Sequence, residues 1–285
     1  MHDVFYFTDI HGNYSLYKAI IDYCNEQDPE AMIIFGGDAC DRGEDGYKIM
    51  KELLDNPYVV YLKGNHEDMF AKAAREIKHE FNFENADRER VKKTLKHTMV
   101  FDWRFAAIQD SVYNGGLTTL TDWVMDGMPM DFVERVEYLP LTFSYEMCDF
   151  CHSAGLYKTF KAVADKEYEG ETIPEWDAQY LLWTRNGLSV DWEPGRIAVF
   201  GHTPTPYLED YTNFKFPEDA EVTPVMYNKN TPKAWKLDMD TGAVFTGRAY
   251  VLNVLTMKAQ GFVDKDVEDK ENRNHDIEKI EVIQF

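Results

Sequence analysis

The sequence predicts an α/β fold, because three polar motifs each follow a short apolar run that is typical of a buried strand. The motifs are Asp9-Ile10-His11-Gly12, Gly36-Gly37-Asp38-Ala39-Cys40-Asp41-Arg42-Gly43 and Gly64-Asn65-His66-Glu67. Their spacing is close to the roughly 30 residues that one strand–helix–strand unit needs. Because functional sites of such folds lie at the carboxyl ends of the strands, we expect these polar residues to meet at one edge of a sheet.

Strands and helices alternate in the first 62 residues. Apolar runs predict strands over residues 4–7, 31–35 and 59–62. Between them, apolar side chains recur at helical spacing over residues 15–25 and 46–54, and this periodicity predicts two crossover helices. Each predicted strand therefore delivers its motif into the loop before the next helix.

Residues 68–139 change to helical periodicity and predict a helical insertion or cap. Within it, Asn114-Gly115-Gly116 demands a turn with positive φ. Two interpretations stay open at this point. The glycines form a turn between helices, or they form a loop over the substrate.

The second half predicts further strands that end at histidines. Residues 142–151 alternate as a strand that leads to His152, and residues 197–200 form a strand that leads to His202. A short helix over residues 177–183 precedes Arg185. Charged residues 157–171 are a candidate rim or lid, 212–233 a long loop, and 236–255 a return to sheet with a turn at 240–242. We therefore divide the chain into a domain over 1–263, containing the insertion, and a charged C-terminal tail over 264–285.

Composition narrows the possible partners. The chain has 285 residues and a formal net charge of −21. This charge argues against sequence-independent binding to nucleic acid and against anionic membranes. The N-terminus lacks the basic and apolar regions of a signal peptide, and no apolar run approaches the length of a membrane span. We expect a cytoplasmic protein with neither nucleic acid nor membrane as a partner, and we interpret Cys148 and Cys151 as two small apolar residues of a strand rather than a redox or zinc pair.

Metal binding is the chemistry that the strand-end residues suit best. Oxygen and nitrogen ligands in this arrangement are typical of a pair of divalent transition metals. We expect Asp9 and His11 to hold the first ion and Asp38 to bridge both. The predicted ligands that complete the second ion are Asn65, His152 and His202. Two ions about 3.5–4 Å apart could deprotonate one bridging water, and we expect that hydroxide to be the nucleophile.

Phosphoryl transfer also needs a phosphate clamp and a proton donor. Guanidinium groups bind phosphate oxygens bidentately and keep their charge, so we expect Arg42 and Arg185 to bind substrate together with Asn65. His66 follows a predicted ligand and can reach the site without binding metal. Asp41 could hold its ring and raise its pKa, which makes His66 the candidate general acid.

These residues resemble the calcineurin-like metallophosphoesterases, and more narrowly the PPP phosphatase branch. Besides the three N-terminal motifs, the resemblance rests on His152-Ser153-Ala154-Gly155, Trp183-x-Arg185 and Gly201-His202-Thr203. It implies a four-layer αββα sandwich with two divalent metal ions, usually manganese in bacterial members and iron with zinc in some others. It also implies the ligand, clamp and acid roles given above.

The resemblance leaves the substrate open. The leading hypothesis is a phosphatase that hydrolyses phosphomonoesters, with phosphoserine or phosphothreonine proteins or a small phosphate ester as partner. The alternative is a dinucleoside tetraphosphate hydrolase, because Asn114-Gly115-Gly116-x-x-Thr119 resembles loops of both groups. A nuclease and a scaffold that lost its chemistry are weaker hypotheses, since basic surface is scarce and every expected ligand, acid and clamp residue is present.

Overall fold

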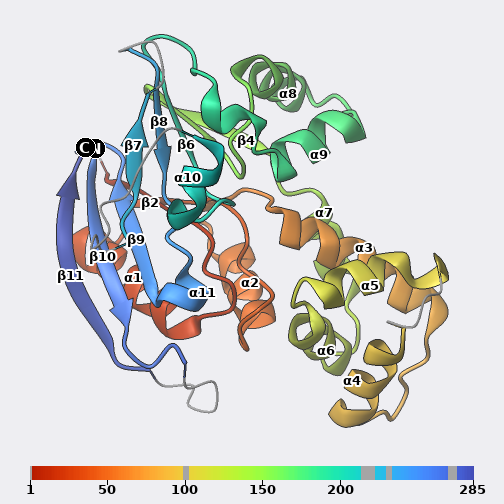
Figure 1. The fold of residues 1–285 in the computed structure, drawn as a ribbon. Coiled ribbons are helices and arrows are strands. Elements are labelled where there is room, and N and C mark those ends of the chain that lie inside the picture. The colour runs from red at the N-terminus through yellow and green to blue at the C-terminus, as the bar shows by residue number, and fades with distance from the viewer. Residues whose placement is uncertain (1, 99–102, 213–221, 229–232, 269–274) are drawn as a thin grey trace.

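The computed structural model describes residues 2–98, 103–212, 222–228, 233–268 and 275–285, and they form an α/β fold with two sheets (Figure 1). The first sheet, as far as it is described, has six strands in the order β11-β10-β9-β1-β2-β3. Its strands are β1 (Val4–Phe7), β2 (Met32–Phe35), β3 (Val59–Tyr61), β9 (Arg248–Asn253), β10 (Lys258–Asp264) and β11 (Ile277–Gln284). Strands β1, β2 and β3 pair in parallel, as their predicted crossover helices require.

The second sheet has the order β4-β5-β6-β8-β7 within the described part of the chain. Its strands are β4 (Thr142–Tyr145), β5 (Cys148–Cys151), β6 (Ile197–Phe200), β7 (Val225–Tyr227) and β8 (Trp235–Asp238). Strands β5, β6 and β8 are parallel neighbours. Their carboxyl ends therefore form one edge, as do those of β1, β2 and β3.

The helices fall into two outer groups and an insertion (Figure 1). Crossover helices α1 (Tyr14–Gln27) and α2 (Gly46–Asp55) flank the first sheet. The insertion consists of α3 (Asn65–Glu80), α4 (Arg88–His97), α5 (Ala106–Tyr113), α6 (Leu117–Met125) and α7 (Met130–Glu137). The remaining α-helices of the described residues are α8 (Tyr157–Glu169), α9 (Glu175–Trp183), α10 (Leu208–Tyr211) and α11 (Ala243–Thr246).

The alternation of side chains along β1 explains the layering. Tyr6 points into a core that joins the two sheets and includes Phe150 of β5. Phe7 points the other way, into the core beneath α1 and α2. On the outer face of the second sheet, Phe200 packs in a third cluster with Phe160 of α8. The order helix–sheet–sheet–helix confirms the predicted fold class.

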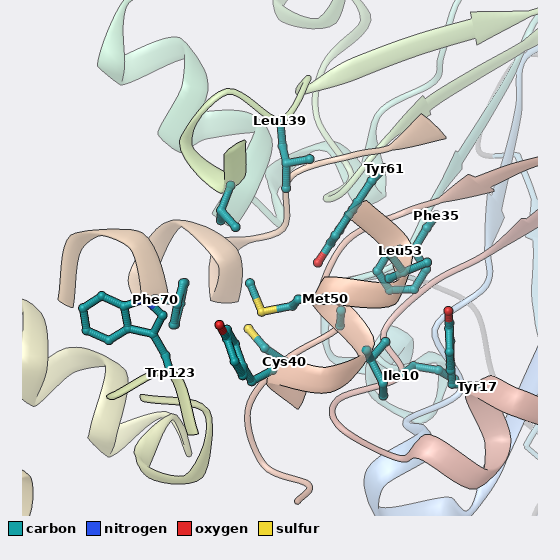
Figure 2. Packing of buried hydrophobic residues seen from close by; sticks show 14 of the residues in the cluster. Ile10, Tyr17, Phe35, Cys40, Met50, Leu53, Tyr61, Phe70, Trp123 and Leu139 are labelled. Carbon is teal, nitrogen blue, oxygen red and sulfur yellow. The ribbon is translucent and has the colours of Figure 1, made fainter. Parts of the chain in front are cut away.

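The insertion shares a continuous core with the first sheet. Figure 2 shows Phe70 and Trp123 of the insertion on one side, Phe35 and Tyr17 on the other, and Met50 of α2 between them. The rings of Phe70 and Trp123 meet edge to face, with centroids 6.1 Å apart. The insertion thus packs against α2 and the first sheet through buried apolar side chains.

Four segments add to or differ from the sequence-based prediction. The strand predicted over 142–151 is a hairpin of β4 and β5, because Glu146 adopts φ +51° in a tight turn. The charged segment 157–171, predicted as a rim or lid, contains helix α8, which ends at Glu169. Residues 277–284, placed in a charged tail, form strand β11 and pair antiparallel with β10. The predicted loop over 212–233 contains strand β7, and its residues 213–221 and 229–232 lie outside the described residues.

Two other predictions hold. Cys148 belongs to the core between the sheets and Cys151 to the outer cluster, so the two cysteines face opposite sides of β5. Gly115 has φ +98°, as the Asn-Gly-Gly motif demands, and it lies in the turn between α5 and α6.

In the described part of the chain, no helix is both long and apolar enough to cross a membrane. The division into a domain over 1–263 with a tail over 264–285 stays a prediction.

Candidate active site

The predicted site residues occupy consecutive strand ends of both sheets. Asp9 follows β1, Asp38 follows β2, and Asn65 begins α3 just after β3. From the second sheet, His152 follows β5 and His202 follows β6. All five are buried. The fold therefore brings side chains that are up to 193 residues apart into contact, as the hydrogen bonds from the His202 N–H to the Asp9 carboxylate show.

Left-handed backbone is concentrated in these loops. The non-glycine site residues with positive φ are Asp9 (54°), His11 (44°), Asp38 (60°), Asp41 (68°), Arg42 (64°) and His202 (69°). Such conformations cost on the order of 1–3 kcal/mol each and are typical of functional sites. A glycine makes room for them, because a Cβ on Gly64 would lie 2.2 Å from Oδ1 of Asp38.

The first group of potential metal ligands consists of His11, Asp38 and His66. Nδ1 of His11 lies 2.9 Å from the Cys40 carbonyl oxygen, so Nδ1 donates and Nε2 keeps its lone pair. This Nε2 lies 3.5 Å from Oδ2 of Asp38. Burial, with the Arg42 charge, holds the pKa of His11 well below its ordinary value, so the ring is neutral and able to bind a cation.

The second group consists of Asp38, His152 and His202. Nδ1 of His152 lies 2.9 Å from the Gly36 carbonyl oxygen, which leaves its Nε2 lone pair 3.4 Å from Oδ1 of Asp38. Oδ1 of Asn65 lies 2.9 Å from both Nε2 of His152 and Nδ1 of His202. The two oxygens of Asp38 thus face different groups.

Asp9 lies beside these groups but is in neither of them. Its Oδ2 accepts a hydrogen bond of 2.6 Å from the Thr8 hydroxyl, and its carboxylate accepts the His202 N–H. Burial, opposed by His152 and reinforced by Asp38, raises the pKa of Asp9 to about 6. A buried carboxylate next to a second one is a group that a bound cation would stabilise.

The donor set fits the predicted metal pair. Imidazole nitrogens whose tautomers are fixed by backbone carbonyls surround a shared carboxylate, and this second-sphere arrangement is typical of metal-binding histidines. Among the described residues, Nε2 of His202 is buried without a hydrogen-bond partner. Although burial alone would raise the pKa of Asp38, the histidines around it, His152 foremost, keep this pKa below the ordinary value.

His66 and Asp41 form a buried pair at the edge of the first group. Nδ1 of His66 lies 2.8 Å from Oδ2 of Asp41, and its Nε2 points toward the centre, 3.8 Å from Oδ2 of Asp38. Burial opposes protonation of His66, but Asp38 and Asp41 outweigh it and raise the pKa above its ordinary value. These two carboxylates therefore make the ring a stronger base than a free imidazole.

Arg42 contacts the centre directly, whereas Arg185 lies over the ring of Tyr211, 5.7 Å from its centroid, and acts on His202 through its charge. The Arg42 guanidinium places Nη1 2.9 Å from Nε2 of His11 and Nη2 3.0 Å from Nε2 of His66. Arg185, which follows α9, lies near the second group. Burial lowers the pKa of His202 well below its ordinary value, and the charges of His152 and Arg185 lower it further.

The insertion supports the loop that carries Asp41 and Arg42. The carbonyl oxygen of Gly115 accepts a 3.1 Å hydrogen bond from the Arg42 N–H. The Thr119 hydroxyl accepts one of 3.0 Å from the Asp41 N–H. The Asn-Gly-Gly turn therefore holds the backbone of the predicted clamp residue, a role that neither of the two earlier interpretations contained.

Glu67 is a site residue to which the sequence analysis gave no role. Its Oε2 accepts hydrogen bonds of 2.8 Å from the N–H groups of Asp38 and Gly64. Its Oε1 accepts bonds of 2.8 Å from the Ala39 N–H and the Tyr61 hydroxyl. Glu67 thereby joins the loop after β2 to the start of α3. In the sequence, the position of Glu67 directly after Asn65-His66 could have indicated this role.

Asp238 and Asp240 are two further buried carboxylates that the sequence analysis did not assign to the site. Burial raises the pKa of both groups well above the ordinary value, and the mutual repulsion with Asp9 adds to it. The Asp240 carbonyl oxygen accepts a 2.7 Å hydrogen bond from the Thr205 N–H. This bond ties the loop containing His202 to the end of β8. The sequence offered only a turn signal at 240–242.

Fold and site together define an α/β protein with two groups of potential metal ligands that share Asp38. Residues 3–230 match the family of calcineurin-like phosphoesterases, and the chain belongs to this family. It is therefore a metal-dependent phosphoester hydrolase of a family that uses a dinuclear metal centre. No curated protein shows significant sequence similarity to it.

Solved structures resemble this chain at low sequence identity. A mutant of a cold-active protein tyrosine phosphatase matches with 12% identity and a TM-score of 0.50, over 99% of this chain and 81% of that one. A metallophosphoesterase from Sphaerobacter thermophilus matches with 12% identity and a TM-score of 0.47, over 98% of this chain and 88% of that one. A protein serine/threonine phosphatase from Saccharomyces cerevisiae matches with 12% identity and a TM-score of 0.44, over 100% of this chain and 81% of that one. At such identities the likeness concerns the fold alone.

Proposed function

We propose that this protein is a phosphatase for phosphomonoesters and that its substrates are phosphoserine and phosphothreonine residues of proteins. The position of Arg42 carries this proposal. One guanidinium spans His11 and His66 beside the carboxylate that joins both ligand groups. A planar fork in this place suits two oxygens of a single terminal phosphate.

Two divalent ions, when bound, would neutralise phosphate charge and activate water. Asp38 would be shared between them, Asp9 and His11 would serve the first ion, and the remaining ligands are those of the second group with Asn65. We propose manganese as the ion, with iron or zinc as alternatives, because the donors are carboxylate, imidazole and amide without a thiolate.

The chain's own residues would bind the phosphate and supply the proton. Arg42 now contacts Nε2 of His66, and a protonated imidazole cannot accept that hydrogen bond. When Arg42 turns to phosphate oxygens, Nε2 of His66 becomes free to carry a proton to the leaving oxygen. Asp41 would hold the ring and stabilise the imidazolium. Arg185 would complete the clamp from the side of the second group.

A side-by-side assay tests the proposal. Chelator-treated protein is supplied with Mn²⁺ and given either a phosphothreonine peptide or diadenosine tetraphosphate. We expect efficient release of phosphate from the peptide and little cleavage of the dinucleotide. The reverse preference would establish the alternative of a dinucleoside tetraphosphate hydrolase. Loss of activity on both, with metal bound, would support the scaffold hypothesis.

A further inference from the structure

A small pocket opens beside the centre, on the side of α1. It has a volume of about 70 Å³, and its walls come from the start of α1, from residues 42–45 and from the C-terminal part of the chain, where Val244, Val267 and His275 contribute. His11 and Arg42 also line it. Because these two residues belong to the centre as well, the pocket begins where the expected phosphate position ends.

Hydrogen bonds hold this pocket in shape. Oδ2 of Asp264 accepts a 2.7 Å hydrogen bond from the Asn13 amide and lies 2.6 Å from Nδ1 of His275. Asn13 in turn caps α1, since its Oδ1 accepts the Leu16 N–H at 3.0 Å. The Asp264 side chain is buried. The wall that carries His275 is therefore fastened to the helix that begins beside His11.

We infer that this pocket is a specificity subsite for the side chain next to the phosphorylated residue, and that it selects small aliphatic side chains over aromatic and acidic ones. The inference rests on the proposed function. Arg42 lines the pocket and also contacts His11 and His66 of the centre, and neighbouring residues of a peptide have Cα atoms about 3.8 Å apart. The adjacent side chain, rather than the phosphorylated one, is thus the group that reaches it.

Size and charge define what the pocket accepts. A cavity of about 150 Å³ is known to hold a benzene ring, and this pocket has roughly half that volume. Val244 and Val267 offer apolar contact to a methyl or isopropyl group. Glu44 and Asp45 also line the pocket, and Arg42 is the one permanently charged cation among its lining residues, all of them described. A carboxylate or a further phosphate would be repelled there.

Matched phosphopeptides test the subsite. They differ only at one of the two residues that flank phosphothreonine, which is Val, Phe or Glu. For wild-type protein with Mn²⁺ we expect kcat/KM to be about tenfold higher for Val than for Phe or Glu at one flanking position. Val267→Phe should abolish the advantage of Val, and Val267→Ala should raise kcat/KM for Phe severalfold. Val282→Phe, on an exposed position of β11, should keep the wild-type preference.

Inhibition by inorganic phosphate separates the subsite from the clamp. We expect the inhibition constant of phosphate to be unchanged in both Val267 variants, because Arg42 keeps its contacts. Equal kcat/KM for all peptides in wild type, or an unchanged preference in Val267→Phe, would overturn the subsite while leaving the phosphatase proposal intact. If wild type cleaved the dinucleotide and none of the peptides, the proposed function would fail, and the subsite with it.

Discussion

At the scale of single residues, Asp38 and His66 divide the work of the centre. Asp38 turns one oxygen to each ligand group, and the surrounding imidazoles favour its charged form. His66 lies within reach of the same carboxylate, yet its other nitrogen is held by Asp41. One residue is thus suited to cations and the other to a proton, although they are neighbours in space.

Replacing His66 with Asn should lower kcat about 10²–10⁴-fold and leave metal content intact. The loss should be greatest for substrates with poor leaving groups, because those need the proton most. Kinetics with alkyl and nitrophenyl phosphates, together with metal analysis, measure both effects. An equal loss for the two substrates would remove His66 from the general-acid role, and loss of metal would make it a ligand.

Lys236 is a buried residue whose charge should be visible in stability rather than in activity. It lies on β8, with Nζ 5.1 Å from the ring centroid of Trp192 and 5.8 Å from that of Phe200. Burial lowers its pKa to about 8 from an ordinary 10.5. The unfolded chain therefore holds this proton over a range in which the folded chain has released it, and the free energy of unfolding should rise as pH increases from about 8 to 10.5.

Replacing Lys236 with Met should remove this dependence and raise the free energy of unfolding at pH 7 by about 1–3 kcal/mol. Urea unfolding at pH 7 and pH 9 measures both effects, with Lys161→Met at an exposed position of α8 as the control. A variant less stable than wild type at pH 7 would show that the cation–ring contacts outweigh the cost of burial.

At the scale of elements, the centre depends on how loops are fastened to one another. Glu67, on the first turn of α3, binds the loop after β2 through two N–H groups and its own helix start through a third. Gly115 in the turn between α5 and α6, and Thr119 in the first turn of α6, bind the next part of the same loop. The helix that follows β3 and the insertion thereby fix the position of Asp38, Asp41 and Arg42.

Replacing Glu67 with Gln should weaken both the fold and metal binding. The amide group of Gln is a donor and would face N–H or O–H donors that are now satisfied, so we expect a loss of about 2–4 kcal/mol in the free energy of unfolding. Chemical denaturation and Mn²⁺ titration measure the two effects. Glu80→Gln, at the exposed other end of α3, should change neither. Unaltered metal affinity in Glu67→Gln would mean that Asp38 is positioned without it.

The elements also show what a sequence can predict. Strands β1, β2, β3 and β6 were predictable because each is a short apolar run that ends in a polar motif. The β4–β5 hairpin was not, because the alternation continues through Glu146-Met147 and no Gly, Asn or Pro marks the turn. Strand β11 was hidden by its charges, which an edge strand tolerates.

In the site, too, a local sequence pattern predicts some residues and not others. Histidines and aspartates at strand ends point to metal chemistry by their type and spacing. The roles of Glu67, Asp240 and Gly115 depend on hydrogen bonds between loops that are distant in sequence, which spacing alone does not contain.

At the scale of the whole molecule, negative charge and the buried centre are linked. The chain carries a net charge of −21, and Asp9, Asp38, Asp238 and Asp240 are buried close to one another. Repulsion among these carboxylates opposes folding, and burial raises the pKa of most of them. Divalent ions bound beside these four aspartates would offset their negative charge.

Metal binding should therefore stabilise the entire fold. An ion present at about 1,000 times its dissociation constant adds about 4 kcal/mol to the free energy of unfolding. For a chain of this size we expect the melting temperature to rise by about 5–15 °C when Mn²⁺ is added to chelator-treated protein. Differential scanning calorimetry measures the shift, and Asp38→Asn provides the comparison. If Asp38 serves both ions, that variant should lose most of the shift and bind neither ion, whereas a variant that kept two ions would show that the groups bind independently.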